Sequence, residues 1–517
     1  MPQINFKCFS ELHEFIRRYN ATSFLEIGTN KCWAKWETKC SNPLDWVYSN
    51  AERNYAVRIM LLASAGSPYK KKNISVEEFN SLINAYYNFD GHTISNKHLL
   101  DEELKNLFEF IKKWEIDNYK KVRNWSFKLS DVLDSELIRD HVAYLDLQRQ
   151  VAFQNSGFGY PISRIQRTIK FIELLDKHSN QTFSDEFFKY TKLPRIDYFK
   201  QILGCLGVFG YFSETKGFCN FSDFSNLIDE EVQKLGITPE SLKLFVKQNS
   251  AYFFAQTDNS FRSKINKNIN MVPRFYQLFF YNQFLEVPFI ELSNEKFCLP
   301  DPFSFTESCW NQIRGIIFNN NNRKRLEQLL SRAFEDYIET VLLPLIIPQS
   351  FEKLTEVENP RSNKDKRADF LITTSSSYIV LECKSSIMSA ETSSYFHPDK
   401  LAELWCRIHS AVEQIRITVE ALKLQDKPVI PLIMTFYDSI AASSVLEEMI
   451  KQTDYCSRMG LNMPPVVYSL HEFEHWISDR SINNWAELIL SKQHNDAPIK
   501  PDNKGHNYDH LKDICIL

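Results

Sequence analysis

The chain lacks the features of membrane-bound and secreted proteins. It has no apolar run near the roughly 18 residues that a membrane helix needs, and its first residues, MPQINFKCFSELHEF, contain no apolar core of a signal peptide. Its eleven cysteines form no C-x-x-C pair and are odd in number, which argues against a zinc ribbon and a disulfide framework and favours reduced thiols. We therefore expect a cytoplasmic protein without a membrane partner.

The chain also lacks a large excess of charge of either sign. Its formal net charge of −4 argues against a protein that coats nucleic acid non-specifically, although it leaves room for a local basic groove. No G-x-x-x-x-G-K-[ST] motif is present, so nucleotide energy would have to come from a partner protein. With 43% hydrophobic and 24% charged residues, the 517-residue chain is typical of a soluble globular protein of two or three domains.

The distribution of apolar positions divides the chain into four parts. Residues 1–150 carry apolar side chains at helical spacing and predict a helical domain. Residues 151–305 are rich in Phe and Tyr and predict a mixed, mostly helical domain of unknown role, with a small winged or hairpin element. Residues 306–495 alternate between helical and strand patterns, and residues 496–517 form a polar tail. A mainly α-helical N-terminal region should therefore precede an α/β domain.

The alternation in the third part is regular enough to assign its elements. A stripe of leucines and aromatic residues predicts a helix within 319–346, which Pro344 limits. The other predicted elements are strands at 369–374, 377–383, 428–437 and 465–470 and helices at 399–424, 441–452 and 471–478. A strand hairpin followed by helices that alternate with apolar strands is the pattern of a mixed sheet flanked by helices.

Two carboxylates and a lysine lie at the ends of the two strands of the predicted hairpin. Asp369 opens its first strand, and Glu382 and Lys384 end the second. Because side chains alternate along a strand, Glu382 and Lys384 share a face, and Asp369 on the antiparallel neighbour can lie beside Glu382. The two carboxylates and the backbone carbonyl of Cys383 would form an all-oxygen site for Mg²⁺ or Mn²⁺. Lys384 could then stabilise an attacking hydroxide or the charge on a phosphate. A purely structural ion pair at the sheet edge is the alternative.

At these residues the chain resembles the PD-(D/E)xK nuclease superfamily, whose members have a restriction-endonuclease-like fold. The resemblance covers about residues 320–478 and rests on Asp369, Glu382, Lys384 and the strands that bear them. It implies a metal-dependent nuclease, an endonuclease acting on DNA in preference to RNA. A large additional region beside such a nuclease suggests restriction or anti-phage defence, with a regulatory protein or a second copy of the chain as partner.

Members often carry two further polar residues, and this chain has a match for each. Glu335, in the sequence RAFEDYIETVL, corresponds to an acid on the helix before the hairpin, and Gln414 to a glutamine on the helix after the lysine. In one branch a tyrosine follows four residues later, where this chain has Thr418. The proline that names the motif is replaced by Ala368.

Basic residues precede the first acid. Lys364, Lys366 and Arg367 lie in a loop that could hold a phosphate backbone, although a solvated loop explains them equally well. The basic run at 322–325 is more typical of an ordinary solvated surface.

Two rival functions fit parts of the sequence. The first is a catalytically silent protein that keeps the fold to bind nucleic acid or a partner. The second is a zinc protease, because His471, Glu472 and His475 match the H-E-x-x-H motif. Against the protease, Glu474 adds a second charge inside the motif, which follows directly on a predicted strand. We therefore expect these residues to open a peripheral helix.

Overall fold

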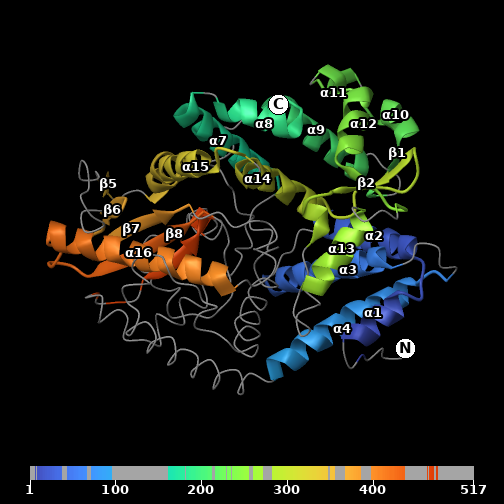
Figure 1. The fold of residues 1–517 in the computed structure, drawn as a ribbon, viewed down its shortest axis with the longest axis horizontal. Coiled ribbons are helices and arrows are strands. Elements are labelled where there is room, and N and C mark those ends of the chain that lie inside the picture. Colours follow the sequence, from blue (N-terminus) through green and yellow to red (C-terminus); the bar gives the residue numbers. More distant parts are fainter. Residues whose placement is uncertain are drawn as a thin grey trace.

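The computed structural model describes residues 9–37, 43–66, 72–95, 161–211, 216–271, 282–346, 350–354, 367–385, 398–436 and 465–474, with short gaps inside several of these ranges. This part of the chain is rich in helices and contains two mixed sheets (Figure 1). None of its helices is both long enough and apolar enough to cross a membrane.

The N-terminal helices form a core together with elements from the middle of the chain. These helices are α1 (Phe9–Ile16), α2 (Ala21–Glu37), α3 (Pro43–Ala65) and α4 (Val76–Ser95). Their buried side chains pack in one cluster with those of α13 (Phe261–Met271), β3 (Phe289–Glu291) and β4 (Lys296–Cys298). The first core is therefore built from segments far apart in the sequence.

The middle of the chain contributes helices and a small sheet. Its other elements are α7 (Pro161–Ser179), α8 (Thr182–Thr191), α9 (Arg195–Leu206), the π-helix η3 (Gly207–Tyr211), β1 (Phe218–Asn220), η4 (Phe221–Asp223), α10 (Phe224–Leu227), α11 (Glu230–Lys234), α12 (Pro239–Gln248), β2 (Ser250–Tyr252), η6 (Gln283–Leu285) and α14 (Pro302–Phe318). The strand order is β1-β4-β3-β2, and only β2 and β3 pair in parallel. The sequence predicts a small winged or hairpin element around the glycine-rich run at 203–212 and the TKG turn at 215–217. The described residues of this stretch form the end of α9, η3 and β1 instead, and the hairpin of the small sheet, β3–β4, lies later in the chain.

The C-terminal region contains the second sheet. Its elements are α15 (Arg323–Tyr337), η7 (Ile338–Leu342), η8 (Leu343–Ile346), β5 (Ser350–Lys353), β6 (Phe370–Thr373), β7 (Tyr378–Lys384), α16 (Pro398–Leu422), β8 (Val429–Thr435) and β9 (Val466–Ser469). The strand order is β5-β6-β7-β8-β9, antiparallel from β5 to β7 and parallel from β7 to β9. The coarse prediction of a mixed sheet flanked by helices is confirmed. Strand β5 was not predicted, and the helix predicted at 441–452 lies outside the described residues.

Strand β8 accommodates a proline although it lies inside the sheet. Alternate residues of β8 bond to β7, as shown by Phe436, whose N–H donates to the carbonyl of Lys384 at 3.1 Å. The backbone nitrogen of Pro431 therefore faces β9. Pairing with β9 begins one residue later, at Leu432. The missing N–H of Pro431 thus removes no bond from the sheet.

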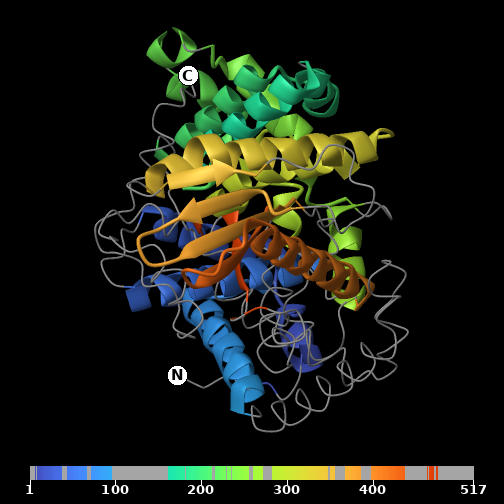
Figure 2. The ribbon, with the colours of Figure 1, turned by 90° about the vertical axis from the view of Figure 1, so that its left-hand side faces the viewer.

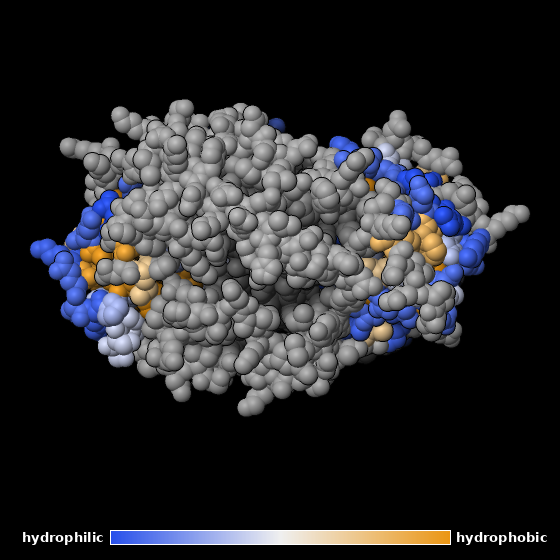
Figure 3. All heavy atoms as spheres, turned by 90° about the horizontal axis from the view of Figure 1, so that it is seen from below, coloured by the Kyte–Doolittle hydropathy of each residue, from blue (hydrophilic) through white to orange (hydrophobic). Residues whose placement is uncertain are grey.

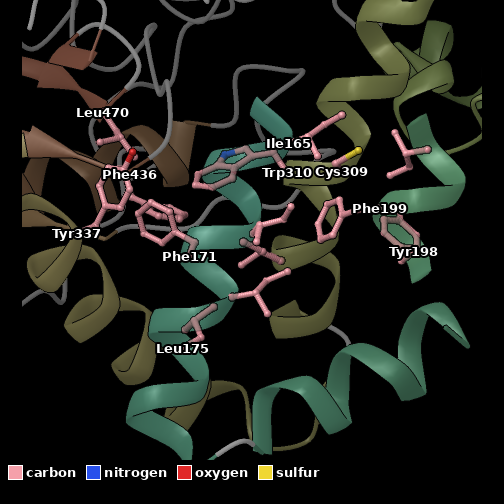
Figure 4. Packing of buried hydrophobic residues seen from close by; sticks show 14 of the residues in the cluster. Ile165, Phe171, Leu175, Tyr198, Phe199, Cys309, Trp310, Tyr337, Phe436 and Leu470 are labelled. Atoms are coloured by element: carbon pink, nitrogen blue, oxygen red, sulfur yellow. The ribbon is translucent and has the colours of Figure 1, made fainter. Parts of the chain in front are cut away.

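Helices cover both faces of the C-terminal sheet, with α15 on one side and α16 on the other (Figure 1 and Figure 2). On the α15 side, Phe171 of α7 stacks on Tyr337 of α15 with ring centroids 4.6 Å apart. Phe171 also meets Phe436 after β8 at 5.0 Å and Trp310 of α14 at 5.2 Å (Figure 4). These rings belong to a second core that continues from α7 to the sheet.

This second core crosses the predicted domain boundary at residue 305. Helix α7, which precedes the boundary, packs on both α14 and α15. Helix α14 (Pro302–Phe318) itself spans the boundary, and Arg53 of α3 forms a buried ion pair at 2.8 Å with Asp301, the residue before this helix. The C-terminal region therefore depends on earlier parts of the chain for its packing.

Seen from below, the described atoms at both ends of the molecule combine a hydrophilic rim with adjacent apolar side chains (Figure 3).

Candidate functional site

The two predicted carboxylates lie on neighbouring strands at one end of the C-terminal sheet. Pairing of Phe370 with Leu381, continued by one residue, places Asp369 opposite Glu382. The N–H of Asp369 still donates to the carbonyl of Leu381 at 3.1 Å. Beyond this bond the ladder changes, because Oδ2 of Asp369 accepts a hydrogen bond from the N–H of Cys383 at 2.7 Å. The aspartate side chain thus takes the place of a backbone acceptor.

The predicted lysine and glutamine join the same group. Nζ of Lys384 donates to Oε1 of Glu382, on the same face of β7, and to Oε1 of Gln414 at 2.7 Å. Gln414 lies on α16, and its Nε2 donates to the backbone carbonyl of Arg367 at 3.3 Å. The lysine is therefore held between a strand and the helix that covers it.

Burial dominates the electrostatics of the two acids. Glu382 is only 2% exposed, and burial raises its pKa to about 8, with the nearby charge of Asp369 acting in the same direction and Lys384 opposing it. Asp369 keeps part of its surface exposed, yet burial also raises its pKa, while the N–H of Cys383 and the charge of Lys384 act to lower it. The single lysine therefore offsets the desolvation of the two carboxylates only in part.

Glu335 approaches this group from α15. Its side chain is partly buried, and its charge is among those that raise the pKa values of Glu382 and Cys383. One turn earlier on α15, Ser331 shares a hydrogen bond of 2.5 Å with Ser385, the residue after Lys384. This contact fixes α15 against the end of β7 and so holds Glu335 near the carboxylates.

Residues 368 and 418 contact each other beside Asp369. The N–H of Ala368 donates to Oγ1 of Thr418 at 2.7 Å, and the same hydroxyl donates to the carbonyl of Gln414 at 2.8 Å. Both side chains are buried, with Thr418 0% exposed. Because proline has no N–H, a proline at position 368 could not make the first bond. The threonine thereby anchors the residue next to Asp369.

Cys383 lies between Glu382 and Lys384 on β7. Its side chain points to the opposite face from Glu382 and packs against the second core, and burial raises the pKa of its thiol. In an extended strand the N–H and carbonyl of one residue point to the same side. The carbonyl of Cys383 is therefore directed toward β6, as its bond to Asp369 requires.

The oxygen atoms at this edge of the sheet are of the kind that a divalent cation binds. Among the described residues, no three His, Cys, Asp or Glu side chains gather as a metal cluster. However, Oε2 of Glu382 is buried and has no hydrogen-bond partner within the described part of the chain. Two opposed carboxylates with an unused buried oxygen suit a hard cation that completes its shell with a backbone carbonyl and water. Asp369, Glu382 and the carbonyl of Cys383 therefore fit Mg²⁺ or Mn²⁺.

The other predicted residues lie only partly within the described structure. Arg367 is partly exposed, whereas Lys364 and Lys366 lie outside the described residues. The same holds for His471, Glu472 and His475 of the protease motif. Glu474, inside that motif, is 1% exposed and accepts hydrogen bonds from Arg167 of α7 and Tyr337 of α15. Its role is thus to tie the segment after β9 to two helices.

Sequence reasoning missed the residues that support the site. From the sequence alone, Thr418 is only a departure from a tyrosine, and no pattern marks Ser331 or Ser385. The spacing of Gln414 and Thr418, four residues apart on one helix, is a signal that both face the strand end.

Comparison of the chain with family models, with curated proteins and with solved structures found no match.

Proposed function

We propose that this protein is a metal-dependent nuclease that hydrolyses phosphodiester bonds of nucleic acid. The observation that carries the proposal is the placement of Asp369 opposite Glu382, with Lys384 held beside them. The element order supports a restriction-endonuclease-like fold: a helix, three antiparallel strands, a helix, and then strands parallel to the third. DNA as substrate, and a setting in restriction or anti-phage defence, follow from the resemblance alone.

Asp369, Glu382 and the carbonyl of Cys383 would hold Mg²⁺ or Mn²⁺. Such an ion polarises a phosphate and lowers the pKa of a bound water. Lys384 supplies a positive charge beside the carboxylates, where it can orient a hydroxide or stabilise charge on the phosphate. Gln414 positions this lysine through the 2.7 Å hydrogen bond. Glu335 adds negative charge from α15 and has a secondary role.

Cleavage assays test the proposal. The full-length protein would be incubated with plasmid, linear duplex and single-stranded substrates, with Mg²⁺, Mn²⁺ or a chelator. We expect cleavage with either metal, none with the chelator, and loss of rate in Lys384→Ala without loss of the fold. The double variant His471→Ala, His475→Ala should cleave normally and lose no bound zinc. Binding of nucleic acid without cleavage under any metal condition would instead favour the catalytically silent alternative.

A further inference from the structure

Helix α15 carries its charges in an unfavourable order. Its first three residues, Arg323, Lys324 and Arg325, are basic, its first turn has no acid and its last turn has no cation. Glu335 and Asp336 lie further along, where η7 and η8 continue the helical backbone. The helix dipole favours acids at the N-terminus, so the three cations there cost helix stability. Folding of α15 therefore does not explain why its N-terminal half is basic.

The exposed residues of this half form a continuous surface. Lys324, Arg325, Gln328 and Arg332 are all exposed, and their spacing of three and four residues places them on one side of the helix. The opposite side is buried against the second core. We call these four residues the α15 track. Arg323 is not part of it, because it pairs with Glu327 at 2.8 Å.

The cations of the α15 track are available for a ligand. Within the described part of the chain, no carboxylate forms an ion pair with Lys324, Arg325 or Arg332. The track includes no acid and contributes three positive charges over about 12 Å, the rise of eight helical residues. An uncompensated row of cations attracts a polyanion.

The α15 track leads to the candidate site. Ser331 and Glu335 continue the row of Lys324 and Gln328 along α15, at intervals of four, three and four residues. Ser331 is bonded to Ser385 at the end of β7. Figure 1 shows α15 running beside the strands that bear the carboxylates. Sequence alone treats residues 322–325 as solvated surface, whereas the structure places the track in line with Glu335.

We propose that the α15 track binds the phosphate backbone of a nucleic-acid duplex and directs it to Asp369, Glu382 and Lys384. The inference rests on the proposed function and names the surface that its substrate would use. One strand of a duplex presents a phosphate about every 3.4 Å of helix axis, so about 12 Å of track spans three or four phosphates. Each of the three cations of the track can therefore contact one phosphate. Gln328 can donate to a phosphate oxygen between them.

Equilibrium binding tests the proposal without requiring cleavage. A fluorescent DNA duplex would be titrated with the full-length protein in chelator, over a series of salt concentrations. The test variant is Lys324→Gln, Arg325→Gln, Arg332→Gln. The matched control is Lys247→Gln, Lys264→Gln, Lys267→Gln, which removes the same charge from exposed positions on α12 and α13.

The plot of log affinity against log salt falls, and each lost phosphate contact should make its slope shallower by about 0.9, or by about 2.7 for three contacts. Between about 50 and 200 mM salt the wild type should then lose about 40-fold more affinity than the test variant. The control should retain the wild-type slope, and the test variant should melt no lower than the wild type because its helix dipole is relieved.

An unchanged slope in the test variant, or an equal decrease in the control, would overturn the proposal. This outcome is separable from failure of the nuclease function. If the test variant shows the expected smaller slope but the wild type cleaves no substrate, the binding surface stands and the nuclease proposal fails. If the wild type cleaves and the slope is unchanged, the nuclease proposal stands and the track is not its binding surface.

Discussion

Replacing Thr418 with valine should destabilise the protein and impair its candidate site together. Valine keeps the shape of the side chain but removes Oγ1, which accepts the N–H of Ala368 at 2.7 Å. Both residues are buried, so water cannot replace the lost partner. A buried donor without an acceptor costs about 1–3 kcal/mol. The free energy of unfolding should fall by this amount in urea denaturation.

The same variant should show a local effect at Asp369, which follows Ala368 directly. Hydrogen exchange of the Ala368 amide should accelerate more than that of strand amides in β8, because its acceptor is gone. Metal-dependent cleavage should fall by about 10-fold to 100-fold, since small displacements of a catalytic group have effects of this size.

A double-mutant cycle separates the hydrogen bond from other consequences. Ala368→Pro removes the donor, Thr418→Val removes the acceptor, and the double variant removes both. Strain of the proline ring that does not involve residue 418 occurs in the single and double variants and cancels in the cycle. We expect a coupling energy of about 1 kcal/mol or more. Strictly additive costs, or a Thr418→Val variant as stable as the wild type, would refute the role assigned to this bond.

Three further predictions concern charge and packing. Burial raises the pKa of Glu382 from 4.5 to about 8, so the folded protein retains a proton that the unfolded chain releases. Without metal, stability should therefore decrease as pH rises from about 4.5 to about 8, and Glu382→Gln should remove most of this decrease in pH-dependent urea denaturation. Glu335→Gln should slow single-turnover cleavage without abolishing it. Glu339→Gln should have little effect, because Glu339 pairs with Lys353 at 2.7 Å. A larger effect of Glu339→Gln than of Glu335→Gln would show that Glu339, not Glu335, is the acid that contributes to cleavage. Phe171→Ala should lower the free energy of unfolding by about 3–5 kcal/mol, and a loss below 1 kcal/mol would argue against the shared core.

The local pattern of apolar and polar residues was sufficient to predict the strands that carry the candidate site. Strand β8 is buried at every residue and appears in the sequence as a continuous apolar run, as expected for an interior parallel strand. The hairpin that opposes Asp369 and Glu382 follows from two apolar runs and a polar turn. Strand β5 was missed because all four of its residues are exposed, so no hydrophobic alternation marks it.

Tertiary contacts account for the remaining differences. The strands of the small sheet have three residues each, too few for a pattern to be recognised. Stacking of Phe171 on Tyr337 joins residues far apart in the sequence, and neither helix alone indicates its partner. For the same reason a fragment that begins near residue 306, which sequence pattern alone suggests could fold, would expose the face of α15 that α7 covers.

The most direct test of the central claim is cleavage and Mn²⁺ binding by the two acid variants, measured on the same samples. Asp369→Ala and Glu382→Ala should each bind Mn²⁺ far more weakly than the wild type and cleave no duplex, because each removes one of the two carboxylates proposed to hold the ion. Glu420→Ala, an exposed acid on α16, is the control and should behave as the wild type does. Persistent metal-dependent cleavage in both acid variants would show that Asp369 and Glu382 are not the catalytic carboxylates.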